Sequence, residues 1–135
     1  MKHVKAILLV LGFSLFIISC KKEKDEHVPP NVSLKTSTGY TSADATVAQG
    51  ATIKVGFVAE KTEDELKTFN VSHAFDGAST TITDQTFTLE NDEEDHYEKD
   101  YTFTTRAQAG TEKYIFTITD RDGNIAQKTI TLTVQ

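Results

Sequence analysis

The sequence predicts an all-β fold, a single β-sandwich of about seven antiparallel strands. From Val32 onward, short runs rich in threonine, valine, isoleucine, phenylalanine and tyrosine alternate between apolar and polar residues, which is the period of a half-buried strand. Polar or glycine-containing breaks separate these runs, as turns do. Residues 32–135 are enough for one ordinary domain and too few for two.

The strongest strand candidates show this alternation clearly. Residues 112–135 contain two alternating runs joined at Asp122 and Gly123. An Asp-Gly pair at such a junction predicts a hairpin with a two-residue type I′ turn, in which both turn residues need positive φ. Residues 61–67, KTEDELK, have the composition of a single helical turn. The other strong strand candidates are residues 51–59, 66–75 and 97–106, and the weaker ones are residues 32–35, 46–47, 80–83 and 86–89.

The first residues predict an export signal. Lys2 and Lys5 precede an apolar run over residues 6–19. A helix needs ~20 apolar residues to span a bilayer, so this shorter run favours a signal peptide that is removed over a transmembrane anchor. We therefore divide the chain into a signal peptide (1–19), a flexible tether (20–31) and the sandwich domain (32–135).

Residues 17–20, Ile-Ile-Ser-Cys, resemble the lipobox of bacterial lipoproteins. In that family the cysteine thiol is acylated, the peptide is cut before the cysteine, and the new amino group is acylated as well. The resemblance implies that Cys20 is the lipidation site and that the mature protein is a membrane lipoprotein anchored there. Cys20 is the only cysteine, so an intrachain disulfide is excluded. The alternative is a free thiol after an ordinary signal peptide.

The segment after Cys20 is polar, charged and closed by Pro29 and Pro30, as a semi-rigid tether would be. Its charged residues, 21–26, resemble the export tags of Bacteroidota-type surface lipoproteins, with a solvated linker as the alternative. An outer-membrane location in the cell envelope follows, facing either the periplasm or the outside. Without Lys2 and Lys5 the formal net charge changes from −6 to −8, which argues against a nucleic-acid partner.

Residues 110–134 resemble the closing hairpin of bacterial immunoglobulin-like repeats of the PKD and cadherin-like kind. The matching positions are Gly110, Tyr114, Asp120 and Gly123. The resemblance implies an immunoglobulin-like sandwich, with Gly123 in the turn and Tyr114 as a candidate tyrosine corner. Such families serve adhesion, carbohydrate binding and plain spacing, so the fold does not name the function.

Two acidic segments are candidate calcium sites. Asp120, Asp122 and Asn124 alternate at the final turn, but an EF-hand loop starting there would need glycine and glutamate where Ile125 and Thr131 stand. A turn chosen for hairpin geometry is the alternative. The run over residues 90–100 is dense in carboxylates that a hard cation would screen, and the alternatives are a solvated loop or a partner-recognition segment. Its candidate calcium ligands are Asp92, Glu94 and Asp95, and His96 is a candidate ligand for a transition metal.

No catalytic constellation is evident in the sequence, so we expect no enzyme. His73 alternates with apolar residues and reads as a packed or edge residue more than a catalytic base, and Tyr40 is a candidate aromatic for stacking on a sugar. The leading hypothesis is a cell-envelope lipoprotein whose domain is a non-catalytic binding or adhesion module for a protein or glycan ligand. The alternatives are a structural spacer or accessory subunit of an envelope complex, and an enzyme inhibitor.

Overall fold

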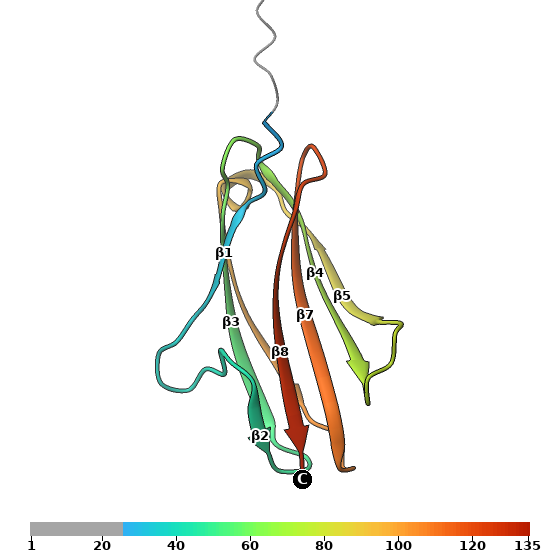
Figure 1. Ribbon diagram of the computed structural model, residues 1–135. Coiled ribbons are helices and arrows are strands. Elements are labelled where there is room, and N and C mark those ends of the chain that lie inside the picture. The colour runs from blue at the N-terminus through green and yellow to red at the C-terminus, as the bar shows by residue number, and fades with distance from the viewer. Residues whose placement is uncertain (1–25) are drawn as a thin grey trace, which may run out of the picture.

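A computed structural model describes residues 26–135 of the chain (Figure 1). The expected signal peptide, Cys20 and the first part of the tether lie outside the described residues. Between residues 26 and 135, no helix is long and apolar enough to cross a membrane.

The described residues form strands that pack as two sheets, face to face (Figure 1). A three-stranded sheet has the order β1-β3-β6, and a five-stranded sheet has the order β2-β8-β7-β4-β5. The elements are β1 (Asn31–Leu34), β2 (Ala45–Val47), β3 (Thr52–Glu60), β4 (Leu66–Phe75), β5 (Ile82–Thr88), the 3-10 helix η1 (Asn91–Glu94), β6 (His96–Thr104), β7 (Gly110–Asp120) and β8 (Ile125–Val134).

The strand order makes the domain an immunoglobulin-like β-sandwich, which confirms the expected fold class. The start of the chain serves both sheets: β1 pairs antiparallel with β3, and β2 then crosses to the other sheet and pairs with the end of β8. The β2–β8 pair is parallel, whereas the sequence predicted antiparallel strands throughout. The loop over residues 35–44 between β1 and β2 makes no net reversal of the chain, so β2 keeps the direction of β1 (Figure 1).

The core lies between the sheets and is built from the apolar phase of each strand. Phe57 on β3 and Phe69 on β4 meet with ring centroids 4.6 Å apart, and both are fully buried. Val55, Phe116 and Ile118 are fully buried as well. The apolar side chains of the alternating pattern in residues 51–59 and 112–135 therefore lie in the core, as predicted.

Three local predictions were wrong. Residues 61–67 contain no helical turn, since residues 62–64 are bends and β4 begins at Leu66, and the only helix in residues 26–135 is η1, inside the acidic run. The segments 80–83 and 86–89 belong to one strand, β5, whose pairing with β4 shifts register. The final hairpin exists, but its connection spans residues 121–124, and Gly123 (φ 92°) takes positive φ while Asp122 does not. It is therefore no type I′ turn.

The two ends of the sandwich differ, and we name them by where the tether enters. The tether end comprises the entering residues 26–30 with the segments 60–65, 90–95 and 120–124, at the top of Figure 1. The distal end comprises the loops 48–51, 76–81 and 105–109, which connect the opposite ends of the strands.

Candidate functional site

The last tether residues are fixed to the domain at the tether end. The Val28 N–H donates to Glu63 Oε1 at 2.8 Å, and the Thr62 hydroxyl donates to the Val28 carbonyl at 2.8 Å. Pro30 is buried. These contacts hold residues 28–30 against the domain.

Most carboxylates of the described domain gather at the tether end. Few cations accompany them there: Lys61 pairs with Asp95, and the Arg121 guanidinium contacts Asp64 Oδ1 at 2.5 Å. The hydrogen bond that Lys61 donates to Asp95 raises the pKa of Lys61. The carboxylates are those of Glu26, Glu60, Glu63, Asp64, Glu65, Glu90, Asp92, Glu93, Glu94, Asp95, Asp120 and Asp122.

The candidate calcium ligands of the final turn have structural partners. Asp120 is fully buried, and its two carboxylate oxygens accept from the Asn124 backbone N–H at 2.8 Å and side-chain amide at 2.9 Å. These bonds close the turn around Gly123. Asp122 is exposed and lies 3.4 Å from Arg121 Nε. The geometry matches the hairpin-turn interpretation of this segment.

The candidate ligands of the acidic run lie on and beside η1. Asp92 is exposed, Glu94 is half-buried, and Asp95 pairs with Lys61. His96, the candidate transition-metal ligand, contacts Glu60 and Glu98, and its hydrogen bond to Glu60 raises the pKa of His96. Over residues 26–135 as a whole, no group of three or more histidine, cysteine, aspartate or glutamate side chains is arranged to hold a metal ion. The structure therefore does not gather the six predicted calcium ligands into a site.

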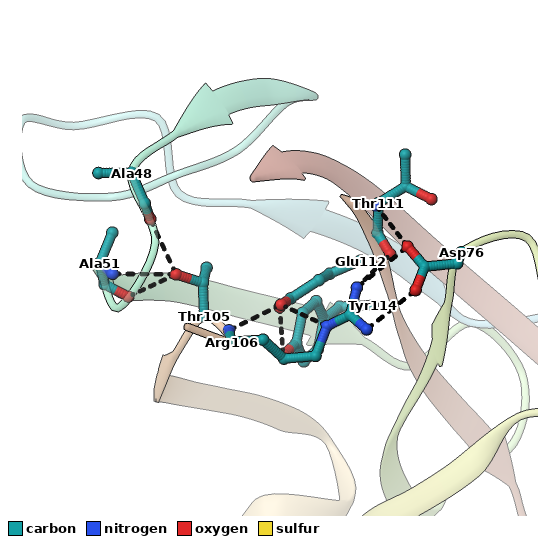
Figure 2. A network of polar contacts seen from close by, with 8 residues as sticks. All are labelled: Ala48, Ala51, Asp76, Thr105, Arg106, Thr111, Glu112 and Tyr114. Atoms are coloured by element: carbon teal, nitrogen blue, oxygen red, sulfur yellow. Dashed lines mark hydrogen bonds and ion pairs between the residues drawn. The ribbon is translucent and has the colours of Figure 1, made fainter. Parts of the chain in front are cut away.

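The distal end is organised by Arg106 (Figure 2). Its guanidinium makes two contacts with the Asp76 carboxylate, Nη1 to Oδ2 at 2.9 Å and Nη2 to Oδ1 at 3.1 Å. Its Nε donates to Glu112 Oε1 at 3.1 Å, and its backbone N–H donates to the same oxygen at 2.8 Å. The guanidinium also lies 4.1 Å from the centre of the Phe75 ring. One side chain thus joins the β4–β5 loop, the β6–β7 loop and the start of β7.

Glu112 is the buried centre of this distal network. Its side chain is 0% exposed, and its second oxygen accepts from the Tyr114 hydroxyl at 3.1 Å. Burial raises the pKa of Tyr114, so the hydroxyl keeps its proton and remains a donor. The contact differs from the expected tyrosine corner, in which the hydroxyl would bond to the backbone a few residues upstream. The partner of the Tyr114 hydroxyl is thus a buried carboxylate.

Asp76 and Thr105 extend the network to all three distal loops. Asp76 accepts from the Thr111 N–H at 2.9 Å, and the hydrogen bonds from Arg106 and Thr111 lower its pKa. The buried Thr105 hydroxyl donates to the Ala48 carbonyl at 3.0 Å and accepts from the Ala51 N–H at 2.9 Å. In the three loops the only charges are those of Asp76 and Arg106, which neutralise each other. The distal end is therefore a rigid, nearly neutral surface of small polar residues.

The outer face of the five-stranded sheet is also poor in charge. Among the outward-facing residues of β4, β7 and β8 that pair with a neighbouring strand, Lys113 is the one charged residue. Small hydroxyl and amide side chains fill most other positions. Gln127 donates to the Thr117 hydroxyl across the β7–β8 pair at 2.9 Å. The positions with hydroxyl groups are Thr68, Ser72, Thr111, Thr117, Thr119, Thr129, Thr131 and Thr133.

Tyr40 and His73 were considered from the sequence as a sugar-stacking aromatic and as a catalytic base, and both side chains have partners within the domain. The Tyr40 hydroxyl donates to Asp100 Oδ2 at 2.7 Å, and its ring is covered by the Lys54 ammonium at 4.5 Å. His73 lies 2.7 Å from Asp84 Oδ1, with Phe75 packed on its ring at 4.4 Å between centroids. Both side chains are engaged within the domain, which leaves no aromatic platform at Tyr40 and matches the packed interpretation of His73.

Among known proteins, only solved structures resemble this chain, and the resemblance is too distant to carry an argument. No protein-family model matches the chain, and no curated protein matches it. Among solved structures, murine CRIg matches with 11% sequence identity and a TM-score of 0.42, over 80% of this chain and 99% of that chain. A match of this quality says nothing of a ligand, so the site must be judged from its own geometry.

Sequence reasoning missed the distal network, although one signal pointed to it. Glu112 stands in the same strand phase as Tyr114 and Phe116, so alternation alone places a carboxylate on the core face of β7. A buried carboxylate needs a cation or several donors. Its partner, Arg106, lies in a loop whose path the alternation does not predict.

Proposed function

We propose that this chain is a cell-envelope lipoprotein, anchored in the outer membrane through Cys20, whose immunoglobulin-like domain binds a protein partner without catalysis through its distal end. The observation that carries the proposal is the Arg106 network, which fixes three loops at the end opposite the tether. Binding sites are most effective when a rigid scaffold holds their loops in place before the partner arrives.

The position of the proposed anchor relative to the two ends of the sandwich supports the distal end as the binding surface. With Cys20 in the membrane, the tether would hold the acidic end toward the lipid surface and present the distal end away from it (Figure 1). In antibody variable domains the binding loops include those that follow strands B and F. Here the corresponding loops, β3–β4 and β7–β8, lie beside the tether. A partner approaching from outside would therefore meet the distal loops.

The surface favours a protein partner over a glycan. Sugar-binding faces commonly use exposed aromatic rings, and in residues 26–135 the exposed large apolar side chains are Val28, Ile82 and Ile125, none of them aromatic. The distal loops instead offer small side chains and backbone groups, the adaptable polar contacts found in many protein-binding loops.

Photo-crosslinking in the native host tests the proposal. A photoreactive phenylalanine analogue is placed at Ser79 in the distal end, at Thr129 on the five-stranded face, or at Glu93 in the tether end, all exposed positions. We expect a discrete protein adduct from Ser79 alone. An adduct from Glu93 or Thr129 with none from Ser79 would reject the distal end as the binding surface.

The anchor is tested separately by cell fractionation. The Cys20→Ser variant is expected to leave the membrane fraction, while Ser19→Ala, which keeps a small residue before the cysteine, is expected to stay there. If Cys20→Ser fractionates with the membrane like the parent, lipidation at this residue is not the anchor.

A structural spacer or accessory subunit is the second candidate. It is favoured by the lack of an exposed aromatic cluster in the described residues and by the path of the chain, which enters at one end of the sandwich while Gln135 lies at the other (Figure 1). A spacer would give no discrete adduct from any of the three crosslinking positions.

A further inference from the structure

The two sheets of the sandwich leave several strand edges unpaired. β1 and β6 border the three-stranded sheet, and β2 and β5 border the five-stranded sheet. β2 pairs only with residues 132–134 of β8, so residues 125–130 of β8 form a further edge. Unpaired backbone groups on such edges accept strands from other chains unless something prevents it.

On β6, Lys99 points into the sandwich from its edge. It stands opposite the fully buried Phe57 in the β3–β6 pair, so its side chain lies on the core face. Its ammonium is 4.5 Å from the centre of the Phe87 ring on β5, across the open side between the sheets. The side chain remains half-buried, with solvent access at this edge.

On β8, Lys128 occupies the equivalent position. It stands opposite the fully buried Phe116 and in phase with the buried Ile130, yet it is exposed, and β2 does not extend to pair with this part of β8. A strand added here would place its own core-facing side chains against the Lys128 ammonium.

On β5, Asp84 combines an inward charge with a bulge. Gln85 pairs with Val71 and Thr83 pairs with Ser72, so Asp84 is an extra residue on the edge strand. Its carboxylate turns inward to His73 Nδ1 at 2.7 Å and is 21% exposed. The irregular register breaks the ladder that an added strand would need.

The remaining edges are protected by their length. β1 has 4 residues and β2 has 3, too few to template a stable added strand. Every long edge of the described domain thus carries an inward-pointing charge, and every edge without one is short.

We propose that Lys99, Lys128 and Asp84 block edge-to-edge pairing with a second copy of this chain and keep the domain monomeric. A second strand would cover each charged group and remove its water without supplying a partner, which is unfavourable. The proposal does not depend on the anchor or on the distal binding surface. It does predict that partners are recognised by surfaces already formed in the domain and not by strand addition.

The test uses Lys99→Val and Lys128→Val, singly and together, in the full chain purified in detergent. Protein mass is determined by light scattering with absorbance and refractive-index detection. We expect a monomeric parent and at least a doubling of protein mass in the double variant, since valine restores an apolar edge of high strand propensity. Circular dichroism and thermal melting confirm that each variant is folded.

Matched controls separate edge position from charge. Lys113→Val removes the same charge from the central strand β7 and should remain monomeric, and Lys99→Arg should remain monomeric because it keeps an inward cation. The proposal is overturned if the parent itself is dimeric, if the folded double variant stays monomeric, or if Lys113→Val associates as strongly.

Discussion

Replacing Arg106 with alanine should destabilise the domain more than any other single removal of a surface cation. Among residues 26–135, the guanidinium is the one cation that contacts Glu112, whose side chain is fully buried. In the Arg106→Ala variant the Glu112 carboxylate keeps only the backbone N–H of residue 106 and the Tyr114 hydroxyl as donors. Asp76 at the same time loses both guanidinium contacts.

The magnitude follows from the burial of the pair. Removing one partner of a buried ion pair costs about 3–5 kcal/mol, because the other charge is left without a counterion in a poorly solvated site. Arg106 is 24% exposed and Glu112 retains two donors, so the lower limit applies, about 3 kcal/mol. For a domain of this size that corresponds to a fall in melting temperature of roughly 12 °C.

Urea unfolding and thermal melting of the purified full chain measure the effect. Arg121→Ala is the control, because Arg121 pairs with three carboxylates where Arg106 pairs with two, but it is 57% exposed at the tether end. Arg121→Ala should lower the stability far less than Arg106→Ala, because exposed ion pairs are screened by water and contribute little. Arg106→Lys should recover only part of the stability, since an ammonium cannot reproduce the paired contacts to Asp76.

A double-mutant cycle with Glu112→Gln isolates the pair. In the Glu112→Gln background, where the carboxylate is replaced by a neutral amide, Arg106→Ala should lower the free energy of unfolding clearly less than it does in the parent. Equal losses for Arg106→Ala and Arg121→Ala, or a cycle with no coupling, would refute the argument that a buried charge at Glu112 holds the distal end together.

Three further outcomes are expected. Gly110→Ala should lower the urea midpoint, because Gly110 has φ 153° and an added Cβ would stand 2.2 Å from Asp76 Oδ1; a midpoint equal to the parent's would contradict this. Hydrogen bonds from a lysine and a tyrosine lower the pKa of Asp100 to about 2, so its stabilisation is present above the unfolded value of about 3.9 and is lost as pH falls through about 2. The difference between the urea midpoints at pH 5 and at pH 2.5 should therefore be smaller in Asp100→Asn than in the parent. The melting temperature should be the same in millimolar calcium and in EDTA, because Asn124 already occupies both carboxylate oxygens of Asp120; a calcium-dependent rise would reject that reading.

The layer structure and most strands were predictable from alternation alone. In residues 51–59 and 112–135 one side chain in two is apolar, and those side chains form the core. The four positions that suggested an immunoglobulin-like hairpin each have a physical role. Gly110 leaves room for Asp76, Tyr114 donates to Glu112, and Asp120 with Gly123 shapes the final turn.

What the sequence could not predict depends on contacts between distant segments. Residues 61–67 have helical composition, but Thr62 and Glu63 hold the tether and Arg121 donates its backbone N–H to the Glu65 carbonyl, so tertiary contacts decide their conformation. The final turn contains the favoured Asp-Gly pair, yet Asp120 supplies hydrogen bonds to Asn124 that stabilise a longer connection. Propensity and spacing describe neither the contacts of residues 61–67, which join segments far apart in the chain, nor the side-chain hydrogen bonds within the final turn.

One sequence feature, a charged residue in the apolar phase of a strand, marks both the distal network and the protected edges. On the central strand β7 such residues are Glu112 and Asp120, and both are fully buried and fully bonded by groups from adjoining loops. On the edge strand β6 and on the unpaired part of β8, the same feature gives Lys99 and Lys128, which keep access to solvent. The strand phase alone therefore predicts that the charge points inward, whereas its role follows from the position of the strand in the sheet. Between two neighbouring strands the charge is buried and needs hydrogen-bond or ionic partners. At an unpaired edge it stays hydrated and opposes the pairing of an added strand.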